Sequence, residues 1–219
     1  MKKIIVTGVS EGLGFEVAKK CIEIGIEVVG ISRTKPELDI THYCVDLTNE
    51  NQIIEVVKKI KENHSSFDAL INCAGILSIS KLEDISYDKL EEVFKVNVLA
   101  PAFLTSKLIT LIKQNQADIV NVSSTVGLKA YEEQLAYGAS KWGIRGVTQN
   151  LQLELKKTKC RVIGFNPGGF KSRIFEKATN QKVELGDEWM EPRNLAELMI
   201  TILQLPKNME VSEIIINRK

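Results

Sequence analysis

Short apolar runs rich in β-branched residues alternate along this chain with longer stretches in which apolar positions recur every three or four residues. The first pattern predicts buried strands, and the second predicts helices that turn one face toward a core. Repeated strand–helix alternation favours a parallel sheet with helices on both faces. We therefore predict an α/β fold with a doubly wound parallel sheet of about seven strands, formed as one domain by residues 1–219.

The predicted elements leave one long segment without a regular pattern. The predicted strands comprise residues 3–7, 27–32, 69–72, 118–123, 161–165 and 213–217, with a weaker candidate at 41–45. The predicted helices comprise residues 12–24, 49–62, 86–114, 135–157 and 192–204. Residues 168–191 mix glycines, charges and aromatic rings without a period. Ligands of open α/β sheets bind beyond the C-terminal ends of the strands, so we expect this segment to be a substrate loop or lid.

Composition and charge narrow the class of protein. Hydrophobic residues make up 44% and charged residues 26%, as in ordinary soluble proteins. The 29 basic side chains balance 28 acidic ones without any block of like charge, which argues against nucleic acid or a membrane surface as a partner. The apolar run at residues 4–6 is shorter than the roughly 7 to 15 residues of a signal peptide, and we expect no membrane span of about 20 residues. We therefore expect a cytoplasmic protein.

The cysteines and histidines indicate neither a disulfide framework nor a metal site. His42 and His64 lie far from matching ligands, so we expect them at surface or edge positions and predict no metal. The cysteines are scattered without a CxxC pair, which predicts free thiols in a reducing cytosol. They are Cys21, Cys44, Cys73 and Cys160.

A glycine-rich turn, TGVSEGLG, follows the first predicted strand and contains Gly8, Gly12 and Gly14. Its spacing is G-x-x-x-G-x-G rather than G-x-G-x-x-G. Glycines nevertheless allow a tight turn and the close approach of a diphosphate to the N-terminus of the next helix. A purely structural turn is the alternative. Because the turn lies between a strand and a helix, we predict a dinucleotide-binding site.

The residue at the end of the second strand distinguishes between two dinucleotides. A ribose-reading residue is expected about 20 positions after the glycine turn, and Arg33 in GISRT takes that place. A guanidinium can pair with the 2′-phosphate of NADP, whereas a carboxylate would accept from the ribose hydroxyl of NAD. A solvated arginine is the alternative, and the negative charge of Glu11 in the glycine turn opposes NADP. The sequence thus favours NADP(H), with NAD(H) possible.

A tyrosine and a lysine stand four residues apart in AYGASKWGIRG. Tyr137 and Lys141 therefore share one face of the predicted helix. Gly138, Gly143 and Gly146 each cost the helix about 1 kcal/mol relative to alanine, which indicates that a cofactor or partner helix comes close. A neighbouring ammonium and an oxidised nicotinamide would both lower the phenol's pKa from about 10 toward working pH. Because both residues are common on helices, a chance pairing is the alternative when the pair is taken alone; together with the serine described next, it predicts a general acid–base centre.

Ser124 lies thirteen positions before Tyr137, in NVSSTVG at the end of a predicted strand. Its hydroxyl is placed to hydrogen-bond a substrate oxygen. The glycine turn, this serine and the Tyr-x-x-x-Lys helix together resemble the short-chain dehydrogenase/reductase family, in the subgroup with a TGxxxGxG turn. The resemblance covers nearly the whole chain, about residues 3–204. It implies a Rossmann-type domain that binds a nicotinamide dinucleotide.

The resemblance implies a role for each matching residue. Tyr137 is the catalytic acid–base, Lys141 binds the nicotinamide ribose and lowers the phenol's pKa, and Ser124 orients the substrate, with Ser123 as the less favoured neighbour. The predicted cofactor-binding residues are Gly8, Ser10, Gly12, Leu13, Gly14, Arg33, Asp46, Leu47, Asn72, Ala74, Gly75, Tyr137, Lys141, Pro167 and Gly168.

Three of these cofactor segments are short matches to family motifs. Asp46-Leu47 resembles the acidic position beside the adenine ring. Residues 72–75 resemble the family's NNAG strand end, with Cys73 in place of the second asparagine. Pro167-Gly168, with Ser172 in place of the usual threonine, resembles the nicotinamide-carboxamide loop.

Asn97, in KVNVLAPAF, matches an asparagine that the family uses as a fourth catalytic residue. Pro101 has no N–H, so the carbonyl of Asn97 loses its helical partner. That carbonyl could hold a water that links Lys141 to solvent as a proton relay. A proline kink without a chemical role is the alternative.

The sequence predicts an oxidoreductase that moves a hydride between NADP(H) and a small carbonyl or alcohol substrate. A nucleotide-sensing regulator, or a methyltransferase, would need the glycine turn but not Ser124, Tyr137 and Lys141 together. The resemblance implies a homodimer or homotetramer through helices 86–114 and 135–157, although the short tail EIIINRK argues against a tetramer built from C-terminal contacts. Candidate substrate-pocket residues are Leu128, Lys129, Tyr131, Phe170, Phe175, Trp189 and Met190.

Overall fold

The computed structural model describes all 219 residues and contains a seven-stranded sheet in which every strand pair is parallel. The strand order is β3-β2-β1-β4-β5-β6-β7, so the direction of winding reverses between β1 and β4. The predicted doubly wound α/β fold is confirmed, and the weak candidate at 41–45 is a strand. The strands are β1 Lys3–Thr7, β2 Glu27–Ser32, β3 Thr41–Cys44, β4 Ala69–Asn72, β5 Asp118–Val122, β6 Val162–Pro167 and β7 Glu213–Ile216.

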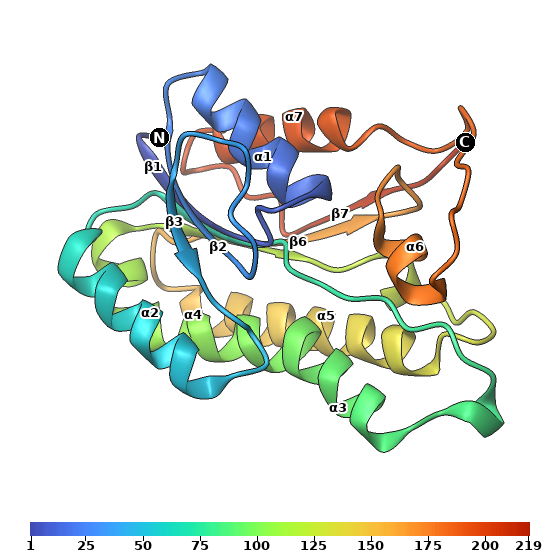
Figure 1. The fold of residues 1–219 in the computed structure, drawn as a ribbon. Helices are drawn as coiled ribbons and strands as arrows, with labels where there is room; N and C mark the ends of the chain where they lie inside the picture. Colours follow the sequence, from blue (N-terminus) through green and yellow to red (C-terminus); the bar gives the residue numbers. More distant parts are fainter.

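Helices cover both faces of the sheet (Figure 1). Helices α1 and α7 pack together on one face, and α2, α4 and α5 cover the other, with α3 extending beside α5. The helices are α1 Gly12–Glu23, α2 Glu50–Asn63, α3 Tyr87–Phe94, α4 Ala100–Asn115, α5 Leu135–Leu155, α6 Ile174–Thr179 and α7 Pro192–Leu203.

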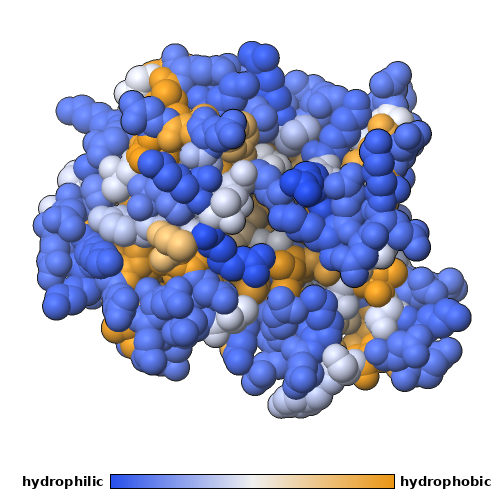
Figure 2. Space-filling model, in the orientation of Figure 1, coloured by the Kyte–Doolittle hydropathy of each residue, from blue (hydrophilic) through white to orange (hydrophobic).

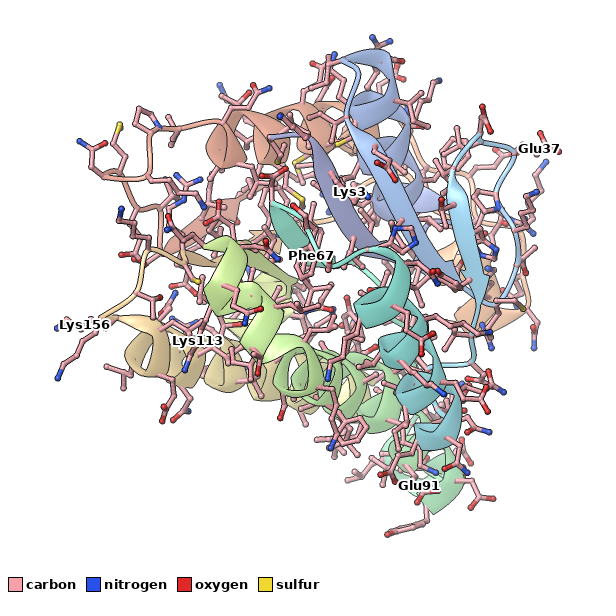
Figure 3. The ribbon with its side chains drawn as sticks, turned by 90° about the vertical axis from the view of Figure 1, so that its left-hand side faces the viewer. Lys3, Glu37, Phe67, Glu91, Lys113 and Lys156 are labelled. Carbon is pink, nitrogen blue, oxygen red and sulfur yellow. The ribbon has the colours of Figure 1, made fainter.

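The central strands are apolar on both faces because each face supplies a separate core. Ile4 and Val6 of β1 belong to the core under α1 and α7, whereas Ile5 between them belongs to the core under α2 and α4. Phe67 fills the second core, and Figure 3 shows it deep inside while Glu91 lies at the periphery. Continuous burial of this kind explains why the strand sequences show no apolar–polar alternation.

The predicted helix 86–114 is interrupted in the structure. It consists of α3, a π-helical segment Lys95–Leu99, and α4 with Pro101 in its first turn. The N–H of Ala100 bonds to the carbonyl of Lys95, five residues back. Pro101 cannot donate to Asn97, so a wider turn at this point avoids one of the hydrogen bonds that an unbroken α-helix would need.

The same stretch, Tyr87–Asn115, is long and apolar enough by length and composition to cross a membrane, contrary to the expectation from sequence. In the fold, 44% of its most apolar window is buried inside the protein. Leu104, Leu108 and Ile112 of α4 pack in the core under the sheet. This packing accounts for the apolar character of the helix.

The segment predicted to lack regular structure, 168–191, contains the six-residue helix α6. The lid segment, as we call residues 168–191, folds back on itself through a bridge between Phe170 and Met190. Trp189 stacks edge-on against Phe175 of α6, with ring centroids 5.3 Å apart. The predicted irregular loop is therefore a packed structure at the C-terminal edge of the sheet.

Candidate active site

A cavity of about 590 Å³ lies beyond the C-terminal ends of the strands. Its walls come from the turn after β1, the ends of β2, β4, β5 and β6, the start of α5, and the lid segment. Figure 2 shows a hollow on this face with both apolar and hydrophilic side chains around it. Its volume lies within the roughly 300–1,000 Å³ usual for ligand sites, and it opens where the strand order reverses.

Nearly all the residues predicted from sequence meet in this cavity. Asn72 and Asn97 are the two that do not line it; both side chains are buried. The predicted residues that line it are Gly8, Ser10, Gly12, Leu13, Gly14, Arg33, Asp46, Leu47, Ala74, Gly75, Ser124, Tyr137, Lys141, Pro167 and Gly168.

Glycine is required at two positions of the turn after β1 for different reasons. Gly8 has a φ of +76°, and a Cβ there would lie 2.8 Å from the Cα of Ala74. A Cβ on Gly14 would lie 2.3 Å from the carbonyl oxygen of Gly8. These contacts are internal to the turn, which locks its backbone against the end of β4. The structural role and the predicted binding role of the turn are thus compatible.

The N-terminus of α1 is open toward the cavity. Glu11 is its N-cap residue but makes no side-chain cap, and the first turn holds no acidic residue. The N–H groups of Gly12, Leu13 and Gly14 are therefore among the unpaired donors that begin every helix. A Cβ on Gly12 would meet only Ser172, at 3.8 Å, so space remains in front of these donors. The arrangement fits a diphosphate.

Ser172 provides a second test of the fit to a dinucleotide. Its hydroxyl oxygen is buried without a hydrogen-bond partner, and the residue lines the cavity opposite the glycine turn. Buried polar groups are normally paired, so this hydroxyl indicates that a ligand group completes it. A carboxamide or phosphate oxygen of a dinucleotide would serve.

Tyr137 and Lys141 project side by side from α5, as predicted. The Lys141 Nζ lies 5.6 Å from the centroid of the Tyr137 ring and donates to the carbonyl of Val122, 3.0 Å away, at the end of β5. The lysine side chain is buried, and it makes no ion pair with a carboxylate. Its charge is therefore available to a ligand or to the neighbouring phenol.

Burial moves the pKa values of this pair in opposite directions. It raises the pKa of Tyr137 to about 12, an effect that the Ser124 hydroxyl offsets in part. It lowers the pKa of Lys141 to about 8. The predicted lowering of the phenol's pKa by Lys141 is not observed, because loss of hydration disfavours both charged forms. At neutral pH the phenol keeps its proton.

Ser124, rather than Ser123, presents its hydroxyl near the phenol. Ser124 Oγ accepts from the N–H of Val126 at 3.2 Å and donates to the carbonyl of Pro167 at 3.3 Å. The Ser123 hydroxyl instead donates to the backbone carbonyl of Lys141 at 2.9 Å, which holds α5 against β5. The Ser123 hydroxyl is thus engaged in holding α5, whereas the Ser124 hydroxyl lies next to the phenol.

These groups form a constellation of a glycine turn, a phenol, a buried amine and a hydroxyl around one cavity. The sequence also matches the family model described as short chain dehydrogenase over residues 2–183, most of the chain. The chain belongs to the short-chain dehydrogenase family. The resemblance drawn from sequence motifs is confirmed.

Individual relatives extend over almost the full length. An uncharacterized oxidoreductase of Staphylococcus saprophyticus is 27% identical over 228 residues, covering 97% of this chain and 95% of the relative. A 4-hydroxyisoleucine dehydrogenase complexed with NADH and succinate is 25% identical, with a TM-score of 0.84 and coverage of 98% and 97%. An alcohol dehydrogenase from the archaeon Thermococcus sibiricus, complexed with 5-hydroxy-NADP, is 20% identical, with a TM-score of 0.88 and coverage of 99% and 96%.

The side chain of Asn97 in this short-chain dehydrogenase links two segments of the chain by hydrogen bonds. Its side-chain oxygen accepts from the N–H of Ile76 at 2.9 Å, and its amide donates to the Ile76 carbonyl and to Ser140, each at 2.9 Å. A Cβ on Gly75 would lie 3.4 Å from the Asn97 oxygen and 3.5 Å from Lys141 Nζ. Asn97 thus fixes the loop after β4 and the turn of α5 that carries Lys141.

Asn72, predicted to bind cofactor, lies within the fold instead of in the cavity wall. It donates to Asn121 at 2.8 Å, and Asn121 donates to Thr148 of α5 at 3.0 Å. This chain of side chains ties β4, β5 and α5 together. Cys73, which departs from the family pattern, is half-buried, and burial raises the pKa of its thiol to about 12 despite the opposing charge of Lys141.

The adenosine end of the predicted site holds both signs of charge. Arg33 is exposed after β2, and its charge helps to lower the pKa of Asp46, although hydrogen bonding from Thr48 has the larger effect. Asp46 accepts from the Thr48 N–H at 2.9 Å and from its hydroxyl at 2.8 Å. Glu11 pairs with Lys177 of α6, which neutralises its charge and joins the lid segment to the glycine turn.

Sequence reasoning found part of the substrate side of the cavity. Tyr131, Phe170, Phe175 and Trp189 line it, whereas Leu128, Lys129 and Met190 do not. Among the residues that it missed are Lys89, Gln134, Arg173, Lys177 and Arg218.

Two of the missed residues carried a usable sequence signal. Gln134 precedes Tyr137 by three residues, so it shares a helical side with the phenol. Arg218 follows the last predicted strand, and the C-terminal ends of parallel strands meet at the ligand-binding edge. The position of Lys177 depends on a helix that apolar periodicity did not reveal.

Proposed function

We propose that this short-chain dehydrogenase transfers a hydride between NADP(H) and the carbon of a carbonyl/alcohol pair, with Tyr137 as the general acid–base. The observation that carries the proposal is the convergence of Tyr137, Lys141 and Ser124 in the cavity that also contains the open N-terminus of α1. When bound, the nicotinamide supplies or accepts the hydride. The protein supplies orientation and a proton.

The protonation states of the pair suit carbonyl reduction at neutral pH. Ser124 and Tyr137 would hold the carbonyl oxygen, and the phenol, whose pKa is about 12, would donate its proton to the developing alkoxide. Lys141, with a pKa of about 8, would still be largely charged and would stabilise the phenolate left behind. In alcohol oxidation the same groups would act in reverse.

Asn97 would contribute through its backbone. Its side chain is fully engaged with Ile76 and Ser140, which leaves the carbonyl that Pro101 does not pair. We propose that this carbonyl holds a water on the path between Lys141 and solvent.

The preference for NADP(H) is supported by Arg33 and by the state of Glu11. Arg33 lies at the adenosine end of the cavity, where a 2′-phosphate would meet it. The ion pair with Lys177 neutralises Glu11, which removes the main objection to a phosphate there. The two solved relatives bind NADH in one case and an NADP derivative in the other. Arg33→Asp should therefore weaken NADPH binding and spare NADH.

The lid segment would close the cavity, and helices α4 and α5 would form an interface with a second copy. Leu99, in the π-helical segment before α4, and Trp142 and Leu153 of α5 are large apolar side chains exposed at the surface. We propose a homodimer or homotetramer built through them. The four cysteines are free thiols, which suits the proposed cytoplasmic location. Sedimentation of the purified protein tests the assembly.

The decisive experiment is a screen of carbonyl and alcohol compounds with NADPH and NADH, followed by absorbance of the reduced nicotinamide. Tyr137→Phe should bind NADPH as the wild type does and lose turnover by about 10³-fold, because the proton donor is gone. Tyr131→Phe is the matched control, since it removes a phenol from the same cavity but not from α5. Undiminished turnover in Tyr137→Phe would refute the assignment.

A further inference from the structure

Basic side chains of the cavity have partners or proposed roles, with one exception. Lys89 lies 2.7 Å from Glu92, and Arg173 and Lys177 both pair with Glu11. The exception is Arg218, which lines the same cavity but makes no ion pair. The basic residues that line the cavity are Arg33, Lys89, Lys141, Arg173, Lys177 and Arg218.

Arg218 is held in place by an aromatic ring. Its guanidinium carbon lies 4.4 Å from the centroid of the Trp189 ring. Stacking on a ring holds an arginine by one face and leaves its in-plane N–H donors free for a ligand. This arginine therefore presents a charge without a counter-ion.

The ring itself has little freedom to move. A Cβ on Gly169 would lie 2.5 Å from the Trp189 ring, so the ring rests directly on the backbone that follows β6. On another side it meets Phe175 edge-on at an interplanar angle of 80°. The stack of Gly169, Trp189 and Arg218 is a preformed part of the cavity wall.

The position of Arg218 along the sheet separates it from the residues proposed to hold the diphosphate and the adenosine end of the cofactor. The glycine turn follows β1 and Arg33 follows β2, whereas Arg218 follows β7, at the opposite edge. Four strand spacings lie between β1 and β7, about 19 Å. Figure 1 likewise shows the C-terminus beside α6. A diphosphate on α1 would not reach this guanidinium.

Arg218 nevertheless lies at the end of the cavity where the chemistry is proposed. A Cβ on Gly168 would lie 3.4 Å from the backbone nitrogen of Arg218. The preceding residue, Pro167, accepts from the Ser124 hydroxyl. The guanidinium is thus on the substrate side, beyond Ser124 as seen from the glycine turn.

We propose that Arg218 binds a carboxylate of the substrate, so that the enzyme acts on oxo acids and the matching hydroxy acids. This inference rests on the proposed oxidoreductase function and specifies its substrate class. A planar guanidinium matches the two oxygens of a carboxylate in a bidentate pair. A single guanidinium balances one negative charge, which fits a carboxylate better than a doubly charged phosphate. The carboxylate binds at Arg218 while the carbonyl carbon, a few bonds away, meets Ser124 and Tyr137.

The test compares acids with their neutral counterparts. Reduction of 3-oxobutanoate, 4-oxopentanoate and 5-oxohexanoate by NADPH and by NADH is measured beside reduction of the three methyl esters. Wild-type protein should prefer at least one acid over its ester. Arg218→Gln should lower kcat/KM for that acid by about ten- to hundredfold, mainly through KM, and change the ester by less than about threefold. Arg218→Lys should recover part of the loss.

Two controls isolate the role of this arginine. Lys219→Gln removes the same charge one residue later at a position outside the cavity wall and should leave both substrates unaffected. The dissociation constant for NADPH should be the same in wild type and Arg218→Gln, because the glycine turn and Arg33, which are proposed to hold the diphosphate and adenosine end, lie after β1 and β2. Binding of each acid to the protein–NADPH complex is followed by fluorescence of the reduced nicotinamide.

The outcomes separate this inference from the function on which it rests. Equal losses on acid and ester, or no loss on the acid, would overturn the role of Arg218. So would failure of all three acids to be reduced or to bind. If the esters are reduced in a Tyr137-dependent way under those conditions, the oxidoreductase proposal stands and only the acid specificity falls. If turnover does not depend on Tyr137, the proposed function itself is wrong.

Discussion

Two buried cations lie at opposite ends of this sheet, and the fold treats them differently. Arg161, just before β6, forms a salt bridge to Asp118 at 2.7 Å and also donates to the carbonyls of Leu203 and Leu205. Lys141, at the C-terminal edge, donates to a single carbonyl and has no carboxylate partner. Lys141 is 5% exposed and Arg161 is 4% exposed, so burial does not explain the difference.

The contrast indicates what each end of the sheet is for. A buried charge is tolerated when it is paired and hydrogen-bonded, and Arg161 meets that requirement completely. Lys141 does not, and its pKa is lowered to about 8 as a result. The N-terminal end is thus arranged for stability, whereas the C-terminal end keeps an unsatisfied charge that a ligand and a phenolate can use.

The largest expected effect comes from removing the unsatisfied charge. Lys141→Met should lower kcat for carbonyl reduction by about 10²- to 10⁴-fold, because the phenolate left on Tyr137 loses its stabilising charge. Steady-state kinetics with saturating NADPH measure this loss. Lys129→Met, outside the cavity wall, is the control and should retain full activity.

Removing the counter-ion at the other end should act on stability instead. Asp118→Asn would leave Arg161 buried without a charged partner, and we expect a loss of about 3–5 kcal/mol in unfolding free energy. Urea denaturation measures the change. Turnover at 15 °C, well below the transition, should stay close to wild type. A variant as stable as wild type would show that the carbonyl contacts alone can hold Arg161.

The dependence of stability on pH should reveal the cost of burying Lys141. Burial lowers the pKa of Lys141 in the folded protein to about 8, from the value of 10.5 usual for a lysine in an unfolded chain. Between these values the unfolded chain binds a proton that the folded chain does not, so the group makes stability rise with pH by roughly 3 kcal/mol in total. Below about pH 8 Lys141 is charged in both states, so the free energy that its burial costs the folded protein no longer changes with pH. The difference between wild type and Lys141→Met across pH 7–10.5 isolates this contribution, and a flat difference would contradict it.

The smallest expected effect is on the rate of reduction in alkali. Tyr137 keeps its proton up to about pH 12, so the lysine sets the limit. As pH rises through about 8, Lys141 loses its charge, and kcat/KM for reduction should fall toward tenfold per unit. Profiles of kcat/KM with a substrate found in the screen measure this. A decrease in kcat/KM that begins only above pH 10 would indicate that the amine of Lys141 titrates as in an unfolded chain.

Sequence was sufficient for the sheet and for most of the candidate site. Strands and the glycine turn could be predicted because burial on both faces and backbone crowding at Gly8 leave direct traces in residue type. Tyr137 and Lys141 share a face through helical spacing alone. The π-helical segment was not predicted, because the apolar periodicity continues across Lys95–Leu99 although the α-helical hydrogen-bond pattern is interrupted there.

What could not be predicted depends on contacts between distant parts of the chain. Glu11 seemed to oppose NADP until its pairing with Lys177, 166 residues away, was visible. The raised pKa of Tyr137 follows from burial that only the assembled cavity creates. Asn72 matched a binding motif, yet its amide is used to join two strands to α5.

The hydrogen bonds of Arg161 also hold a segment of the chain outside the core. By bonding the carbonyls of Leu203, Leu205 and Met209, it anchors the connection that leads from α7 into β7. Strand β7 then leads to Arg218. Arg161, at the N-terminal end of the sheet, thus anchors the chain that carries Arg218 at the C-terminal end. Under the role proposed for Arg218, a substitution that loosens this connection would change substrate preference while leaving Ser124, Tyr137 and Lys141 in place.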